Sequence, residues 1–210
     1  MAKMTLDSRI KNDIRADKLP IDTLLTQAWL SDFYQVSRIP VRDAIGKLLK
    51  DGWLVVEGKK GVKVPPLNAE QAQELYLMRV PLETLALELA FEHLNFASLG
   101  KAQDVLTQLK YNDSLTAIEQ GQLNWQFHLC LYQPCNKPLL LRTLNQLHEQ
   151  CERYIGFQAT KLNYHQQSEN EHYQLLEALK SRRLDQAIEI LSQHIKVAGE
   201  QLVTSLRDSS

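Results

Sequence analysis

Residues 37–54 read SRIPVRDAIGKLLKDGWL, and their spacing predicts one short helix followed by a turn. Ser37 can cap the amino terminus of this helix, and Pro40 suits its first turn, where a missing backbone N–H costs little. Apolar residues recur along one side at Val41, Ile45, Leu48 and Leu49. The helix is therefore amphipathic and carries its charges on the other side. Gly52 closes its carboxy-terminal end.

Two arginines lie near the start of this helix. Arg38 and Arg42 are four residues apart, so their side chains point to the same side. A helix that enters the DNA major groove needs such long bidentate donors in its first turn. The alternative is that both are ordinary solvated charges, with Arg42 neutralised by Asp43 or Asp32. The cap, the proline, the paired arginines, the glycine stop and a basic hairpin together favour DNA binding.

The flanking segments complete a winged helix-turn-helix. A first helix, ending near Lys18, is predicted from Leu6, Ile10 and Ile14. A second helix, capped by Thr26, has a predicted inner face of Trp29, Leu30 and Phe33. Residues 54–56 and 62–64 predict two short strands around a basic, glycine-bounded tip at 57–61. We therefore expect a DNA-binding domain over residues 1–66.

These motifs resemble a known family. The stretch SRIPVRDAIGKLLKDGWLVVEGKKGVKV is similar to the recognition helix and wing of the GntR family of bacterial transcription regulators. The resemblance implies that DNA is contacted by Ser37, Arg38, Pro40, Arg42, Lys59, Lys60 and Gly61. Two departures are visible: Ile39 replaces the usual threonine, and Gln35 replaces the glycine common at the preceding corner. Loss of the threonine hydroxyl bears on operator preference.

Charge is divided unevenly along the chain. Residues 1–64 carry 12 Lys and Arg against 8 Asp and Glu, a balance of +4, whereas the remainder carries 12 against 17, a balance of −5. The amino-terminal third is the part suited to a polyanion. No apolar run approaches the ~20 residues that span a bilayer, and no signal peptide is evident, so we expect a cytoplasmic protein with no membrane partner. The three cysteines fit no metal or disulfide pattern.

The rest of the chain predicts an all-α antiparallel bundle, which makes the fold mainly α. After Pro65 and Pro66, helices are expected at about 69–95, 98–110, 114–133, 137–158, 168–181 and 185–207. Residues 74–90, ELYLMRVPLETLALELA, are similar to the opening helix of the effector domain in the FadR branch of the GntR family (an FCD-type domain), and the short module resembles the VanR-like subgroup. The resemblance implies an effector-binding and dimerisation domain over residues 67–210.

Three histidines of this module are predicted to converge. His128 lies on an apolar stripe four residues after Asn124, so both should face inward. His172 and His194 lie about equally far from the turn at Arg183, which places them level across an antiparallel hairpin. His93, His148 and His165 match no pattern and are interpreted as surface or packing residues.

Three imidazoles and an oxygen ligand form a cage for a divalent ion, with Zn²⁺ favoured over nickel or manganese. The resembled effector domains hold such an ion with one Asp and three His, which correspond to Asn124, His128, His172 and His194. Asn124 offers a neutral carbonyl where the family has a carboxylate, and this departure puts the metal in question. The alternative is that each histidine is a core residue bonded to a backbone carbonyl. Arg79 has two interpretations, an effector carboxylate contact or an i, i+4 salt bridge to Glu83.

The favoured hypothesis is therefore a one-component bacterial regulator rather than an enzyme. It would bind a two-fold related operator as a homodimer, and a small ligand, an organic acid by this argument, would modulate that binding. A second hypothesis is a metal-dependent hydrolase or lyase with a basic appendage. It lacks a glutamate at HExxH spacing beside the histidines. A third is an architectural DNA-binding protein without an effector.

Overall fold

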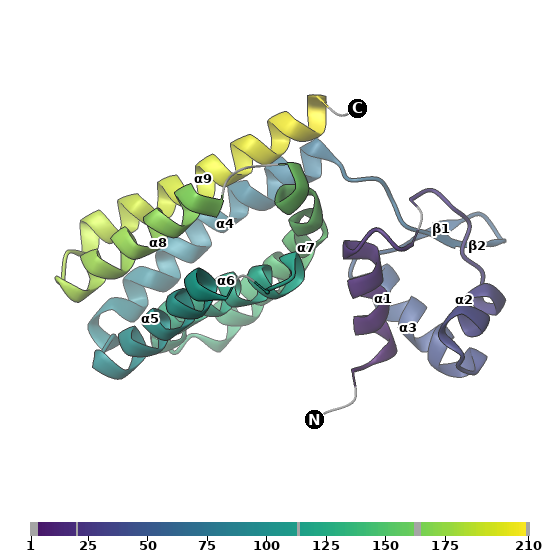
Figure 1. Cartoon of the computed structure of the whole chain (residues 1–210), viewed down its shortest axis with the longest axis horizontal. Coiled ribbons are helices and arrows are strands. Elements are labelled where there is room, and N and C mark those ends of the chain that lie inside the picture. Colours follow the sequence, from purple (N-terminus) through teal and green to yellow (C-terminus); the bar gives the residue numbers. More distant parts are fainter. Residues whose placement is uncertain (1–3, 20, 113, 162–164, 209–210) are drawn as a thin grey trace. The chain divides into compact units, whose positions relative to one another are not determined.

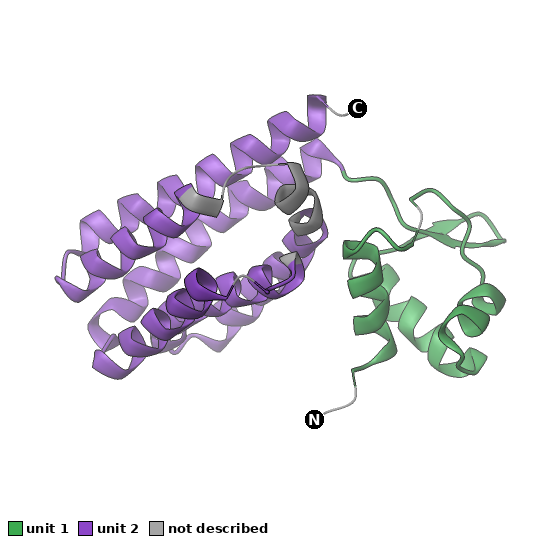
Figure 2. Cartoon of the chain, in the orientation of Figure 1, with its two compact units in different colours: residues 1–67 green, residues 68–210 purple. Residues whose placement is uncertain are grey.

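The chain forms two compact units, residues 1–67 and 68–210 (Figure 2). The computed structural model describes residues 4–19, 21–112, 114–161 and 165–208. Each unit has its own hydrophobic core. The change of unit falls one residue after the Pro65-Pro66 pair, where neither a helix nor a strand ladder can continue.

The first unit is the expected winged helix-turn-helix (Figure 1). Its elements are α1 (Leu6–Arg15), α2 (Gln27–Tyr34), α3 (Arg38–Lys50), β1 (Val55–Glu57) and β2 (Gly61–Lys63). The two strands are antiparallel, with Val56 opposite Val62. The segment before α2 joins this small sheet, because Leu25 exchanges two backbone hydrogen bonds with Val62. The wing is thus anchored to the start of the helix-turn-helix.

Two predicted details of this unit are wrong. The first helix ends at Arg15 rather than near Lys18, because the backbone turns left-handed at Asp17 (φ 55°). Of the predicted inner face of α2, Leu30 is buried, but its buried companion is Tyr34, whereas Trp29 and Phe33 are 40% and 48% exposed. Leu30 and Tyr34 are one helical turn apart and meet the core that α1 and α3 supply. Trp29 and Phe33 stack on each other instead, with ring centroids 4.8 Å apart.

The turn before the recognition helix is held by its backbone conformation. Gln35 adopts the left-handed region at φ 54°, where a glycine carries no steric penalty. Its side chain donates a hydrogen bond to the Asp32 carbonyl at 2.6 Å. The far end of α3 has the predicted glycine, Gly52, also at positive φ. Both ends of the helix are therefore set by local turns.

The second unit contains six α-helices among the residues that the structure describes, as the periodicity predicted. They are α4 (Ala69–Ala90), α5 (Phe96–Tyr111), α6 (Ala117–Tyr132), α7 (Pro138–Lys161), α8 (His165–Lys180) and α9 (Leu184–Asp208). Short 3-10 helices, η1 (Phe91–His93) and η2 (Gln133–Cys135), follow α4 and α6. The Asn68 side chain caps α4 by accepting a hydrogen bond from the Gln71 amide.

The long helix α4 forms the spine of this bundle. It runs alongside α9, while α5 packs on α6 and α8 packs on α9 (Figure 1). The α4–α9 contact is close, because a side chain at Gly199 would lie 2.6 Å from the Tyr76 ring. The fold therefore brings α4, α6, α8 and α9 around one interior. In the described part of the chain, none of the helices combines the length and the apolar character needed to cross a bilayer.

Candidate DNA-binding face and histidine cluster

The exposed side of α3 carries the predicted DNA contacts. Val41, Ala44, Ile45 and Leu48 point into the core, which leaves Arg38, Ile39, Pro40 and Arg42 at the surface. Ser37 occupies the capping position, although its hydroxyl makes no capping hydrogen bond in the structure. Four predicted contact residues therefore share one exposed helix start. Ile39 is 66% exposed among them, which places an apolar side chain on a face otherwise suited to polar contacts.

The ion pair considered for Arg42 is present but weak. Its Nη2 lies 3.5 Å from Oδ1 of Asp43, and the two side chains are 69% and 61% exposed. Exposed pairs of this kind contribute little to stability, on the order of 0–1 kcal/mol. The guanidinium is therefore still available to a stronger acceptor such as a phosphate or a guanine edge.

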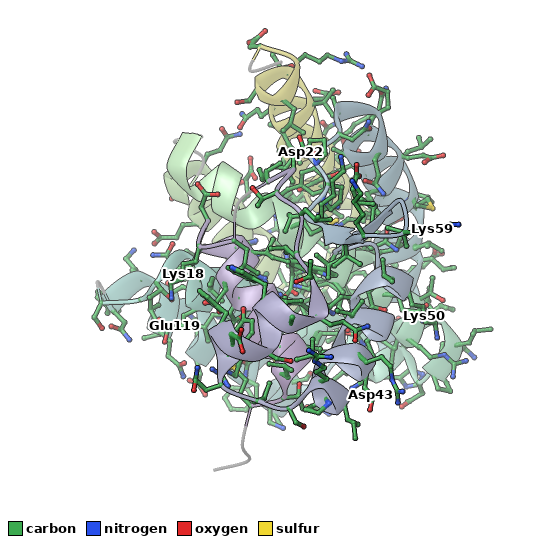
Figure 3. The ribbon with its side chains drawn as sticks, turned by 90° about the vertical axis from the view of Figure 1, so that its right-hand side faces the viewer. Lys18, Asp22, Asp43, Lys50, Lys59 and Glu119 are labelled. Carbon is green, nitrogen blue, oxygen red and sulfur yellow. The ribbon has the colours of Figure 1, made fainter. Side chains whose placement is uncertain are left out.

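Lys59 and Lys60 lie at the tip of the hairpin between β1 and β2. The tip is closed by a hydrogen bond from the Lys60 amide to the Glu57 carbonyl. Lys59 extends outward from this tip, and Asp43 and Lys50 lie along α3 (Figure 3). Both lysines are exposed. Lys63 differs, since its ammonium pairs with Asp22 at 3.1 Å and with Glu57 at 3.3 Å.

Gly61 has a structural reason to be glycine. A Cβ atom there would lie 2.6 Å from the carbonyl oxygen of Leu25. The residue lets the start of β2 approach the segment that precedes α2. Its predicted role at the DNA surface and this packing role are compatible, because the same close approach fixes the tip of the wing.

Three buried histidines meet inside the second unit. His128 comes from α6, His172 from α8 and His194 from α9, and the nitrogens they offer lie within 4.8 Å of one another. Nε2 of His172 and Nε2 of His194 are 3.3 Å apart. A tetrahedral ion with bonds of ~2.0–2.1 Å separates neighbouring ligand nitrogens by about 3.3 Å. The three histidines that were predicted to converge, out of six in the chain, do lie together.

The chemistry of this cluster fits a divalent cation. Nε2 of His128 is buried and makes no hydrogen bond, so one nitrogen faces the cluster without a partner. Burial lowers the pKa of His128 well below its usual value, and the neighbouring His172 and His194 lower it further. Burial and His194 likewise lower the pKa of His172. Neutral imidazoles with available lone pairs are what a borderline metal ion requires.

Asn124 lies one turn before His128 on α6 and is half-buried. Its position on the same side of the helix follows from the four-residue spacing. An amide oxygen can act as a neutral fourth ligand. The cluster would then hold an ion with no carboxylate among its direct ligands.

Arg79 forms the salt bridge that the sequence offered as one of its two interpretations. Its Nε donates to Glu83 at 2.6 Å, and both side chains are buried. Burial alone would lower the pKa of Arg79, but Glu83, together with the neighbouring Cys151 and Tyr76, outweighs burial and keeps that pKa well above the usual value. The guanidinium also lies over the Tyr76 ring, 4.8 Å from its centroid. Arg79 is therefore a paired, charged residue within the bundle.

The same carboxylate connects Arg79 to the histidines. Glu83 accepts a second hydrogen bond from the Tyr132 hydroxyl at 2.8 Å, and that hydroxyl lies 3.1 Å from Nδ1 of His128. Burial and Glu83 raise the pKa of Tyr132 well above its usual value, so the hydroxyl keeps its proton. Tyr132 was not predicted as part of the site, although it stands four residues after His128 and is thus on the same side of α6.

Glu171 was also missed, because it adjoins His172 on a different face of α8. Its carboxylate reaches across to the neighbouring helix, where Oε2 lies 2.7 Å from Nδ1 of His194. A carboxylate behind a ligand imidazole is a common second contact in metal sites. The antiparallel pairing of α8 and α9 was the signal that could have identified it.

Two further histidines with described side chains, His148 and His93, are not members of the three-histidine cluster. His148 on α7 is buried and stacks on Trp125, with centroids 4.2 Å apart. His93 is exposed in η1. The side chain of His165 lies outside the described residues. For His148 and His93, the interpretation as packing and surface residues agrees with these positions.

Comparisons with known proteins agree with both halves of this description. Residues 4–64 match the family described as bacterial regulatory proteins, gntR family, and residues 74–197 match the FCD domain. The HTH-type transcriptional regulator McbR of Escherichia coli (strain K12) is 27% identical over 96% of this chain and 96% of its own length. The Nta operon transcriptional regulator of Aminobacter aminovorans is 26% identical over 82% of this chain and 81% of its own.

A solved structure extends the comparison. A transcriptional regulator described as a GntR family member from Pseudomonas syringae pv. tomato superimposes with a TM-score of 0.61 and 30% identity, and the match covers 97% of this chain and 85% of that one. Both units of the present chain are therefore found together in a known regulator.

Proposed function

Because the chain belongs to the GntR family of bacterial transcription regulators and carries an FCD domain, it is a DNA-binding regulator with a ligand-binding carboxy-terminal domain, and we propose how its two units divide that work. The DNA contacts would come from α3 and the wing: Ser37, Arg38, Pro40, Arg42, Lys59, Lys60 and Gly61. A regulator of this kind works where the DNA is, so we propose a cytoplasmic location. The relatives reported above are regulators, and they give no support to the hydrolase or lyase alternative.

The ligand site would be the three-histidine cluster with a bound divalent ion. The observation that carries this proposal is the unpartnered, buried Nε2 of His128, facing the other two imidazoles. His128, His172 and His194 would hold the ion, with Asn124 as a neutral oxygen ligand. Zinc suits this set best, and nickel or manganese are alternatives. When bound, the ion would supply a positive charge that attracts an anionic group of a small molecule.

A small carboxylate is therefore the proposed effector class. In this arrangement the ion, rather than Arg79, would meet the effector's charge, since Arg79 is already paired with Glu83. A direct Arg79 contact with an effector would require that salt bridge to open. With the salt bridge closed, Arg79 and Glu83 would influence the site only through Tyr132, whose hydroxyl bonds to Glu83.

A homodimer is proposed from an apolar stripe on α4. Leu77, Met78, Leu85 and Leu89 are 72%, 41%, 42% and 38% exposed in the single chain and recur at helical spacing. A second copy would cover this stripe and present two recognition helices to a two-fold related operator. Sedimentation of the wild-type chain beside a Leu77→Glu, Leu85→Glu variant tests the assignment: a wild-type dimer and a folded monomeric variant are expected, and a monomeric wild type contradicts it.

The first experiment measures the metal content of tag-free protein never exposed to chelator. About one ion per chain is expected in the wild type, with loss in His194→Ala and no change in His93→Ala, which alters an exposed histidine outside the cluster. A wild type that neither retains an ion nor takes up added zinc contradicts the metal proposal.

Effector action is tested with labelled duplexes from the DNA beside the protein's own gene. Binding should weaken steeply with added salt. A panel of small carboxylates should shift the affinity of the metal-loaded protein and leave the His194→Ala variant unaffected. Equal shifts in both proteins would place the effector elsewhere.

A further inference from the structure

Two imidazoles of the cluster are held from behind by hydrogen bonds. Each neutral imidazole carries one N–H and one lone pair, so a partner that accepts at Nδ1 leaves the lone pair on Nε2. His128 and His194 each have such a partner at Nδ1, Tyr132 for the first and Glu171 for the second.

The direction of the first bond follows from Glu83. The single proton of the Tyr132 hydroxyl is donated to the Glu83 carboxylate at 2.8 Å, so the hydroxyl oxygen can only accept from Nδ1 of His128. Arg79 in turn fixes the Glu83 carboxylate at 2.6 Å. The order of contacts is therefore Arg79, Glu83, Tyr132, His128, and it orients the lone pair of His128 Nε2 toward the cluster.

The second bond is direct. A carboxylate can only accept, so Glu171 receives the Nδ1 proton of His194 at 2.7 Å and leaves Nε2 of that ring with its lone pair. This makes His172 the donor of the 3.3 Å contact between the two Nε2 atoms in the ion-free protein. The three histidines thus differ. His128 and His194 are preset to bind an ion through Nε2, whereas His172 carries its proton on Nε2 and donates it to His194.

We propose that Tyr132, held by Glu83, and Glu171 are positioning residues that preset His128 and His194 as metal ligands, and that Glu171 supplies through His194 the negative charge that Asn124 lacks. This inference rests on the proposed metal function. Its structural basis is that the chain has no carboxylate at position 124 but has one directly behind a ligand histidine. Outer contacts of this type typically change metal affinity 10–100-fold.

The metal test uses the full chain and competition for Zn²⁺ with a chromophoric chelator. Tyr132→Phe removes the acceptor behind His128, and Tyr154→Phe is its control, a buried tyrosine whose hydroxyl bonds to Asn68 and Gln71 instead. Zinc affinity should fall about 10–100-fold in Tyr132→Phe and stay within about twofold in Tyr154→Phe. Equal affinities in the two variants would overturn the role of Tyr132.

The charge argument has its own variants. Glu171→Gln keeps an acceptor for the His194 N–H but removes the charge, and Glu169→Gln makes the same change two residues earlier, where the carboxylate pairs with Lys110. Zinc affinity should fall about tenfold only in Glu171→Gln, and adding Asn124→Asp should restore it. A Glu171→Gln variant that binds zinc like the wild type, or one that Asn124→Asp does not rescue, contradicts this part.

A second readout does not depend on metal binding. Long-range ¹H–¹⁵N spectra of the ion-free protein should show the Nδ1–H form for His128 and His194 and the Nε2–H form for His172. In Tyr132→Phe, only His128 should gain the Nε2–H form. If the wild-type protein binds zinc but its ion-free tautomers differ from these, the inference about the positioning residues is wrong and the metal function stands. If the wild-type protein binds no zinc, the proposed metal function is wrong as well.

Discussion

The proposed DNA-binding face and the three-histidine cluster carry their candidate functional residues in opposite ways. Ser37, Arg38, Pro40 and Arg42 follow one another at the start of one helix and are exposed. The histidines come from α6, α8 and α9 and are buried with neighbours from α4. An exposed face can change one residue without disturbing its fold. A buried polar network cannot, since each member satisfies another.

The largest expected effect tests the buried side of this contrast. Glu83→Ala leaves the Arg79 charge buried without its carboxylate, which should cost about 3–5 kcal/mol in the free energy of unfolding. Urea denaturation measures this cost, with Glu88→Ala, at an exposed position on the same helix, as the control. A loss below about 1 kcal/mol would mean that the network is less dependent on its members than the geometry implies.

The next effect tests the exposed side. Arg42→Ala should weaken operator binding by about 1–3 kcal/mol while leaving the unfolding free energy within about 0.5 kcal/mol, because its ion pair to Asp43 is exposed. Fluorescence anisotropy and urea denaturation measure the two quantities. Arg142→Ala, exposed on α7, should change neither. A stability loss as large as the binding loss would erase the distinction between the two regions.

Replacing a glycine by alanine should change the free energy of unfolding in opposite directions in the two units. Gly199→Ala places a methyl group 2.6 Å from the Tyr76 ring and should destabilise the protein by about 1–3 kcal/mol. Gly46→Ala, on the exposed side of α3, meets nothing within 4 Å and should stabilise it by up to about 1 kcal/mol through helix propensity. Thermal unfolding gives both values. Two changes of the same sign would contradict the packing described for α4 and α9.

The smallest expected effect concerns the corner before α3. Gln35→Gly removes the steric strain of a left-handed backbone conformation and should stabilise the first unit by about 0.5–1 kcal/mol. Loss of the side-chain hydrogen bond to the Asp32 carbonyl reduces this gain. Asn136→Gly is the counterpart in the second unit, where asparagine already tolerates φ 51° and a smaller gain is expected. Denaturant titration compares them. A loss of stability in Gln35→Gly would show that its side-chain bond outweighs the backbone strain.

The sequence predicted local features well and tertiary contacts unevenly. The recognition helix, its glycine stop and the hairpin follow from short-range spacing, so their positions were correct to within a few residues. The inner face of α2 was predicted as Trp29, Leu30 and Phe33, and only Leu30 of these is buried, because the direction of the core depends on α1 and α3.

The cluster shows the same limit. The convergence of the three histidines could be predicted from helical spacing and from the symmetry of the α8–α9 hairpin, because both are properties of the local sequence. Glu171 and Glu83 were not recognised as their supports, since each acts on a histidine that another helix provides. Contacts between helices depend on how far each helix is rotated, and that rotation is decided by the packing of the whole bundle.

The three tryptophans give the protein a built-in optical readout. Trp29, stacked on Phe33 at the surface of the DNA-binding unit, is 40% exposed, whereas Trp53 in the same unit is fully buried. Trp125 is buried in the other unit and stacks on His148. Water and ionic quenchers such as iodide reach Trp29 far more readily than the other two. Quencher-accessible emission therefore reports on the DNA-binding unit, whereas shielded emission comes from Trp53 and Trp125, one in each unit. Unlabelled protein can thus be followed at the surface around Trp29 during operator titrations.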